Sequence, residues 1–343
     1  MIRNYRLYPA MVALLLLLLA AALAACGGAS KPAPASQPTS PATSANSPTP
    51  PASANTQTTE DSNTPYTVKH AMGETTVKGT PKRVVVLVND AVEAALDLGI
   101  KPVGMVRAWG TDPMYAHLKD QLKDVQIVGD ENQPNLELIA ALKPDLIIGN
   151  KLRQEKVYEQ LSRIAPTVFS TRTNSDTFIN YKVYAEALNK KAEGDKKLAA
   201  FDKRAEELRK QLGDKINTKV SLVRFYVGDK VRIYYNDTFP GGILQKVGLK
   251  RPAAQDKETF ADIIGKERLP EADGDILFYF TLLDDKGETT KTENDWLQDP
   301  LWKNLDVAKK GKAIKVDDGI WNSSGGIISA NLMLDDLNKF LLK

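Results

Sequence analysis

Apolar and polar residues between positions 83 and 170 follow two periods, one typical of strands and one typical of helices. Short runs rich in Val, Ile and Leu predict buried strands, and apolar residues three and four apart predict helices. Asp90 and Glu93 indicate a capping box at the first helix and no further role. Because strands alternate with helices, the pattern favours a mainly parallel sheet covered on both faces. The predicted strands are 84–88, 102–106, 125–128, 146–149 and 167–169, and the predicted helices are 91–98, 136–142 and 154–164.

The middle of the chain is helical. Between Ser175 and Leu212 the pattern predicts two helical pieces, with a break at Glu193-Gly194-Asp195. The second piece carries one apolar stripe, because Leu198, Phe201, Ala205, Leu208 and Leu212 recur at spacings of three and four. After this segment the β-rich pattern resumes, with predicted strands at 219–227, 231–235, 276–279 and 313–316.

The N-terminus has the pattern of an export signal. Arg3 and Arg6 precede an apolar run at 11–23, which is too short and too soon followed by polar sequence for a transmembrane helix. The run ends in Leu-Ala-Ala-Cys at 23–26, which resembles a bacterial lipobox. This resemblance implies cleavage before Cys26 and a diacylglyceryl group on its thiol. The alternative is an ordinary signal followed by a chance cysteine.

Residues 27–64 are almost wholly Ala, Ser, Thr, Pro, Asn and Gln, and only Lys31, Glu60 and Asp61 are charged. Such a segment cannot bury enough apolar surface to offset the entropy of ordering it, so it predicts a tether partly stiffened by proline. The resulting division is a signal peptide at 1–25, a lipidated cysteine with its tether at 26–65, an N-terminal lobe at 66–174, an interlobe helical segment at 175–215 and a C-terminal lobe at 216–343.

Composition narrows the function. The chain has 46 basic and 43 acidic residues, and its formal net charge of +3 falls to +1 once Arg3 and Arg6 leave with the signal. This balance argues against a nucleic-acid partner, which needs a concentrated basic stripe. One cysteine and two histidines, His70 and His117, are too few for a thiolate or imidazole metal cage. We therefore expect no metal site built from protein ligands and no cofactor.

The two halves share one local arrangement. Glu137 stands eight residues before Asp145, which opens the strand at 146–149, and Glu267 stands eight residues before Asp275, which opens the strand at 276–279. From the pattern alone this repeat is either a shared role of the glutamates or chance, including simple stabilisation of a first helical turn by an acidic residue.

Several motifs resemble known binding proteins. PKRVVV (81–86), LGIKPVG (98–104), PNLELI (134–139) and LKPDLII (142–148) are similar to the siderophore and cobalamin class of substrate-binding proteins of ABC importers. VSLVRF (220–225), GLKRP (248–252), DPLW (299–302) and VDDGIWN (316–322) resemble the iron(III)-hydroxamate-binding lipoproteins of Gram-positive bacteria. The similarity runs in order over roughly residues 66–343.

The resemblance implies an α/β fold with two Rossmann-like lobes joined by a single long rigid helix, the class III periplasmic binding protein fold. It implies a ferric siderophore of hydroxamate or citrate-hydroxamate type in the cleft between the lobes, with iron entering only as part of that ligand. It also implies that Glu137 and Glu267 dock on arginines of an importer permease, which works with a cytoplasmic ATPase. The implied protein is a monomer, held by its lipid on the extracellular or periplasmic face of the cell membrane.

A ferric siderophore already surrounds its iron with oxygen, so the cleft must supply arginines and aromatic faces. Arg224 is the first candidate, since it interrupts an apolar strand, although an internal salt bridge would also explain it. Trp321 matches a ligand-facing tryptophan of related hydroxamate binders, and its alternative is a core position. Arg107, Trp109 and Arg153 follow predicted strands at the carboxyl edge, where open α/β sheets bind ligands, or are solvated loop residues. A second group, for which packing is an equal alternative, comprises Tyr226, Tyr235, Phe239 and Arg251.

Three other functions stay open. An enzyme is the first, although the chain has no Gly-x-Ser-x-Gly elbow, Walker loop, His-Glu-x-x-His helix or Gly-x-Gly-x-x-Gly after its first strand. A haem or cobalamin carrier of the same fold is the second, in which Tyr226 or Tyr235 would be an axial ligand of haem. A direct ferric-ion binder is the third.

Overall fold

The computed structural model describes residues 64–110, 112–172, 175–282 and 284–342, which all belong to one compact unit, Thr58–Lys343. The predicted signal peptide, Cys26 and the tether up to residue 63 lie outside the described residues. Within the described residues, the helices are too short or too polar to cross a bilayer.

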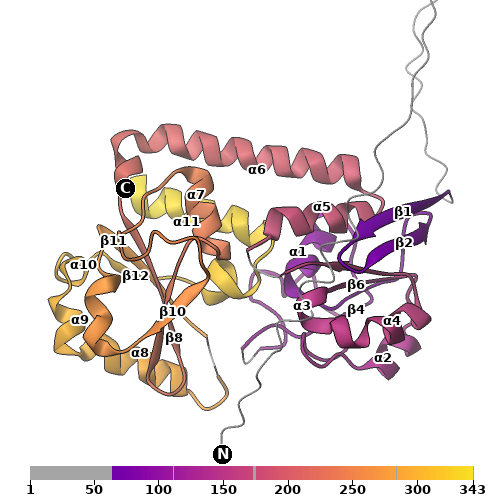
Figure 1. The fold of residues 1–343 in the computed structure, drawn as a ribbon, viewed down its shortest axis with the longest axis horizontal. Helices are drawn as coiled ribbons and strands as arrows, with labels where there is room; N and C mark the ends of the chain where they lie inside the picture. The colour runs from indigo at the N-terminus through magenta and orange to yellow at the C-terminus, as the bar shows by residue number, and fades with distance from the viewer. Residues whose placement is uncertain (1–63, 111, 173–174, 283, 343) are drawn as a thin grey trace, which may run out of the picture. The chain divides into compact units, whose positions relative to one another are not determined.

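The N-terminal lobe, which contains the strands β4 and β6 labelled in Figure 1, is built on a five-stranded sheet in the order β5-β4-β3-β6-β7. All of its pairings are parallel, as the alternation of strands and helices predicts. The strands are β3 (Val84–Val86), β4 (Gly104–Met105), β5 (Gln126–Ile127), β6 (Leu146–Asn150) and β7 (Thr167–Ser170). The helices are α1 (Asn89–Asp97), α2 (Leu136–Ala141), α3 (Lys151–Gln154), η1 (Glu155–Val157) and α4 (Tyr158–Ile164).

An antiparallel hairpin that the sequence reading did not predict precedes this sheet. It consists of β1 (Pro65–His70) and β2 (Gly73–Lys78). Val68 and Val77 bury its inner face, and the Tyr66 hydroxyl donates to the carbonyl oxygen of Ala187 over 2.8 Å. The hairpin therefore packs on the rest of the protein through few apolar side chains and the hydrogen bond of Tyr66.

The C-terminal lobe contains a second five-stranded sheet, in the order β10-β9-β8-β11-β12. β8, β11 and β12 are parallel, whereas β9 and β10 run antiparallel at one edge. The strands are β8 (Val220–Tyr226), β9 (Lys230–Tyr234), β10 (Ala261–Ile264), β11 (Ile276–Thr281) and β12 (Ala313–Lys315). The helices are α7 (Phe239–Val247), η3 (Lys266–Ala272), α8 (Glu288–Gln298), α9 (Pro300–Asn304), α10 (Asp306–Lys309), η4 (Gly319–Ser323) and α11 (Ile327–Leu342).

Helices α5 (Thr177–Ala187) and α6 (Lys191–Leu212), followed by η2 (Gly213–Asn217), carry the chain from one sheet to the other. α6 packs against α7 and α11 of the C-terminal lobe, and Lys197 of α6 forms an ion pair with Asp97 of α1 in the N-terminal lobe, so this 22-residue helix contacts both lobes. The fold class predicted from the sequence is confirmed: mixed α/β, with two lobes and a long helix between them.

The predicted break at Gly194 is wrong. The helix interruption lies at residues 188–190, where Asn189 adopts a φ of 56°, and Gly194 sits in the first turns of α6. A Cβ atom on Gly194 would stand 2.5 Å from the Cβ of Ala185, so the glycine allows α5 and α6 to approach each other. Close packing rather than chain reversal explains this residue.

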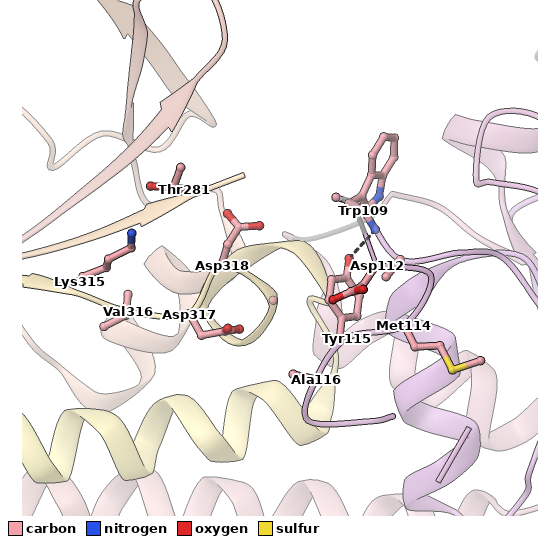
Figure 2. Close-up of a pocket in the computed structure, with 13 residues that line it drawn as sticks. Trp109, Asp112, Met114, Tyr115, Ala116, Thr281, Lys315, Val316, Asp317 and Asp318 are labelled. Carbon is pink, nitrogen blue, oxygen red and sulfur yellow. Dashed lines mark hydrogen bonds between the residues drawn. The ribbon is translucent and has the colours of Figure 1, made fainter. Parts of the chain in front are cut away.

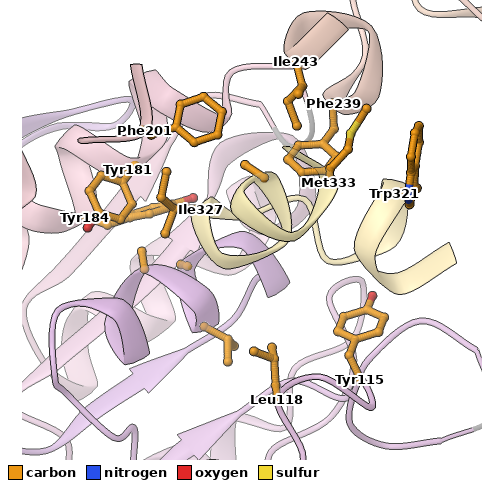
Figure 3. Packing of buried hydrophobic residues seen from close by; sticks show 14 of the residues in the cluster. Tyr115, Leu118, Tyr181, Tyr184, Phe201, Phe239, Ile243, Trp321, Ile327 and Met333 are labelled. Atoms are coloured by element: carbon orange, nitrogen blue, oxygen red, sulfur yellow. The ribbon is translucent and has the colours of Figure 1, made fainter. Parts of the chain in front are cut away.

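One hydrophobic cluster extends through both lobes. It contains Tyr181 of α5, Phe201 of α6 and Met333 of α11, which Figure 3 shows together with their neighbours. Because this core is continuous, the lobes are joined by packed side chains as well as by the covalent chain.

Candidate functional site

A pocket of about 310 Å³ opens between the two lobes (Figure 2). It lies at the carboxyl ends of strands in both sheets, because one wall follows β4 and the other begins at the last residues of β11 and β12. This is the edge at which open α/β sheets bind ligands. The N-terminal lobe contributes Ala108, Trp109, Gly110, Asp112, Met114, Tyr115 and Ala116, and the C-terminal lobe contributes Thr281, Lys315, Val316, Asp317, Asp318 and Gly319.

Trp109 and Arg153, both predicted from the sequence, come together beside this pocket. The guanidinium carbon of Arg153 lies 5.5 Å from the centre of the Trp109 ring, which is 37% exposed and lines the pocket. The Nε of Arg153 is 3.5 Å from a carboxylate oxygen of buried Glu131, so part of its charge is balanced internally. Arg107 is exposed and directly precedes the pocket wall, and its backbone N–H donates to Gly129.

Tyr115 holds the N-terminal wall in place. Its hydroxyl oxygen accepts from the backbone N–H of Trp109 over 3.2 Å, as Figure 2 shows, and burial raises the pKa of the phenol. A Cβ on Gly319 would stand 2.9 Å from the Tyr115 ring. The absence of a side chain at residue 319 therefore allows the ring of Tyr115 to lie close to the backbone of the C-terminal lobe.

Arg224 forms the internal salt bridge that the sequence reading kept as its alternative. Its Nε and Nη2 donate to the two oxygens of Asp318 over 2.6 and 2.8 Å, and Nη2 also donates to Ser323. Nη1 donates to the hydroxyls of Tyr226 and Tyr234 over 2.6 and 3.3 Å. Burial lowers the pKa of this guanidinium, but Asp318 and the two phenols outweigh burial and hold it well above its usual range. All five N–H donors of Arg224 are used.

Four other predicted residues are buried in the fold, where packing accounts for each of them, and their contact with a ligand stays a prediction. Trp321 has no exposed surface, lies 4.5 Å from the Phe278 ring centre and donates to Asp336. Arg251 donates to backbone carbonyls, and burial lowers its pKa to about 10. The remaining two, Tyr235 and Phe239, pack in hydrophobic clusters.

The repeat of glutamate and aspartate has a partly structural basis. Asp145 accepts from the backbone N–H groups of Lys82 and Arg83, and Asp275 accepts from that of Lys219, so each aspartate fixes the start of a neighbouring strand. Glu137 lies in the first turn of α2 and Glu267 in the first turn of η3. Both glutamates are exposed, and neither forms an ion pair with another described residue. Their docking role stays a prediction.

Glu93 joins the two lobes and is not half of a capping box. It is fully buried, and α1 has no side-chain cap. Its carboxylate accepts from the hydroxyls of Ser324 and Ser329 and, over 2.8 Å, from the backbone N–H of Ser329 in the first turn of α11. His117 Nε2 lies 3.1 Å from the same carboxylate. One carboxylate of α1 therefore binds the C-terminal lobe at several points.

This cluster has the residue types of a hydrolase triad but not its geometry. The Ser329 hydroxyl and the Glu93 carboxylate both lie 3.1 Å from one ring nitrogen of His117, so the histidine cannot pass a proton from serine at one nitrogen while the acid orients the other. Ser329 is also fully buried. The cluster is a structural contact between lobes.

Asp90 makes stability depend on pH. It is buried and accepts from Asn180 and Tyr184, yet burial raises its pKa from 3.8 to about 7. Between these values the unfolded chain releases the proton while the folded protein keeps it, so stability falls as the pH rises to 7 and then levels off. We measure the free energy of unfolding by urea titration at pH 5 and at pH 8. Between these two pH values, the free energy of unfolding of Asp90→Asn should fall by about 2–3 kcal/mol less than that of the wild type. Equal losses would contradict this.

The prediction from sequence considered arginines and aromatic residues, so it missed most of the pocket wall, which includes Asp112, Lys315 and Asp317. It also missed Arg232, which donates from Nη1 to the Tyr226 hydroxyl over 3.0 Å. The alternation of residues in β8 and β9 could have indicated Arg232, since residues two apart lie on the same face of a strand. Among the described residues, no group of three or more His, Cys, Asp or Glu side chains could hold a metal ion.

Comparison with known proteins agrees with this geometry. The sequence profile of a family described as periplasmic binding protein matches residues 84–319. The chain is 50% identical over 287 residues to the probable siderophore-binding lipoprotein YfiY of Bacillus subtilis. This match covers 81% of this chain and 88% of YfiY. It is 35% identical over 270 residues to the Fe(3+)-citrate-binding protein YfmC of the same organism, covering 78% and 83% of the two chains.

A solved structure is similar over nearly its whole length. Staphylococcus aureus SirA, crystallised in complex with staphyloferrin B, superimposes with a TM-score of 0.72 at 38% sequence identity. The match covers 80% of this chain and 98% of SirA.

Proposed function

The chain belongs to the periplasmic binding protein family, and from that premise we propose that it captures a ferric siderophore and delivers it to an ABC importer for iron uptake. The single observation that carries the proposal is the pocket between the lobes, which opens at the carboxyl edges of both sheets. The relatives named for siderophores and for ferric citrate support the same class of ligand. The resemblance inferred from the motifs is confirmed.

In this proposal the iron arrives with its coordination shell complete. The pocket wall supports this, because its indole, phenol, carboxylates and lysine can recognise the outer groups of a chelate. The Tyr226 oxygen is a poor axial ligand for haem, since it already accepts from Arg224 and Arg232. Ligands of the hydroxamate or citrate-hydroxamate type fit such a site through their outer oxygens and apolar arms.

Isothermal titration of the purified protein tests the proposal. The panel contains ferric citrate, a ferric citrate-hydroxamate, a ferric trihydroxamate, a ferric triscatecholate, haem and cobalamin. We expect one-to-one saturation by at least one ferric chelate, which is recovered unchanged as a binder requires. Binding of haem or cobalamin alone, or conversion of the chelate, would overturn the proposal.

The chain acts at the outer face of the cell membrane, held by a lipid on Cys26 and working as a monomer with a permease and its ATPase. The signal-like N-terminus and the relatives named as lipoproteins support this location. We expect Cys26→Ser to move the protein from the membrane fraction into the medium, or into the periplasm if the cell has one. Immunoblots of cell fractions measure this, and full retention in the membrane would contradict a lipid anchor.

A further inference from the structure

Arg232 of β9 stands directly opposite Arg224 of β8 in the sheet. Residues opposite each other in an antiparallel pair project from the same face, so the two guanidinium groups are neighbours, and like charges in this arrangement destabilise a sheet. Asp318 balances the charge of Arg224. No carboxylate among the described residues forms an ion pair with Arg232, so one positive charge of the pair is unbalanced.

The two arginines also differ in how many N–H groups are available. Arg224 uses all five, whereas Arg232 donates a single hydrogen bond to a described residue, the one to Tyr226. The Arg232 guanidinium is otherwise held by rings: its central carbon lies 4.5 Å from the ring centre of Tyr226, 5.6 Å from that of Phe260 and 5.9 Å from that of Tyr234. Aromatic faces fix a cation in place without satisfying its N–H donors. Arg232 is therefore positioned but largely unpartnered.

Arg232 lies outside the residues that line the pocket, and hydrogen bonds through Tyr226 and Arg224 connect it to the pocket wall. The Tyr226 hydroxyl accepts hydrogen bonds from Arg224 and Arg232. Arg224 in turn donates two hydrogen bonds to Asp318 of the pocket wall. The pairing with β11 also places Arg224 near the pocket. Phe280 of β11 is opposite Arg224, and the next residue, Thr281, lines the pocket. Arg232 is half-buried, and Phe260 beside it is 43% exposed, so this face is accessible from solvent.

We propose that Arg232 binds an anionic oxygen group of the ferric chelate and selects anionic chelates over those without a free carboxylate. The planar guanidinium presents paired N–H donors that match a carboxylate in two parallel hydrogen bonds. Arg224, whose donors are all engaged, instead positions Tyr226 and Asp318. This inference rests on the proposed function and names which feature of the ligand the same site recognises.

The test compares Arg232→Gln with the wild type by isothermal titration. The probes are ferric citrate and a linear ferric trihydroxamate without a carboxylate. We expect Arg232→Gln to bind ferric citrate about 10- to 100-fold more weakly and the trihydroxamate less than about twofold more weakly. Lys230→Gln is the matched control, since it removes an equal charge from an exposed position of the same strand and should leave both affinities unchanged.

The outcomes separate the two proposals. If the wild type binds none of the ferric chelates, the proposed function fails. If the wild type binds ferric citrate and folded Arg232→Gln binds it equally well, or if the wild type prefers the trihydroxamate, only the present inference fails. Should Arg232→Gln not fold, the side-chain ¹⁵Nε resonance of Arg232 in the wild type decides: a shift on adding gallium(III) citrate supports the contact, and no shift overturns it.

Discussion

Glu93→Ala is expected to destabilise the folded protein by about 3–5 kcal/mol, because it removes the acceptor of three buried hydrogen bonds, and each unsatisfied buried group costs about 1–3 kcal/mol. The variant leaves the Ser324 hydroxyl and the backbone N–H of Ser329 buried without their acceptor, and it removes one partner of the Ser329 hydroxyl. The lost contacts join α1 of one lobe to α11 of the other. We therefore also expect the lobes to unfold less cooperatively, which a lower slope of the urea transition would reveal.

Two variants control for this result. Glu93→Gln keeps the size of the side chain and one carbonyl acceptor, so it should lose clearly less stability than Glu93→Ala. Glu159→Ala removes an exposed glutamate of α4 in the same lobe and should change stability by less than about 0.5 kcal/mol. A loss below about 1 kcal/mol for Glu93→Ala, measured by chemical denaturation, would mean that the lobes do not depend on this carboxylate.

Replacing Glu137 and Glu267 together by lysine is expected to reduce iron uptake by cells to the level of a strain without the protein. Each glutamate is exposed on a different lobe, so the pair can set the orientation of the bound protein on a permease with complementary arginines. Lysine reverses each charge and opposes the partner. The affinity for the ferric chelate should not change, since neither residue lines the pocket.

The matched control reverses two other exposed glutamates, Glu159 in the first turn of α4 and Glu288 in the first turn of α8. This double variant has the same net charge and also carries one change in each lobe. Uptake of radioactive ferric siderophore by complemented cells is the measurement. Normal uptake with Glu137→Lys and Glu267→Lys, or equal loss with the control pair, would remove the docking assignment.

The parallel strands could be predicted because they are buried on both faces and read as continuous apolar runs. β3 and β6 are fully buried in the structure. β10 was missed because an edge strand of four residues, one of them a half-exposed aspartate, carries no such run. The hairpin of β1 and β2 was missed for a similar reason, since it buries few apolar residues.

The site was harder to predict than the fold because partners far apart in sequence decide what each charge does. Arg224 was recognised as a charge in an apolar strand, but Asp318, which balances its charge, lies 94 residues further along the chain. Trp321 matched a ligand position, yet the core between β11 and α11 takes its whole surface. Sequence spacing identifies which residues need a partner, and only the folded chain shows which partner they find.

The tryptophans give the protein an internal optical probe. Trp296, Trp302 and Trp321 are buried, with at most 3% of each exposed, whereas Trp109 is in contact with solvent at the pocket. Shielded indoles emit at shorter wavelengths than hydrated ones, so the long-wavelength edge of the emission spectrum comes mainly from Trp109. A coloured iron complex that enters the pocket should therefore quench that edge first, and a single wavelength can report occupancy without any added label.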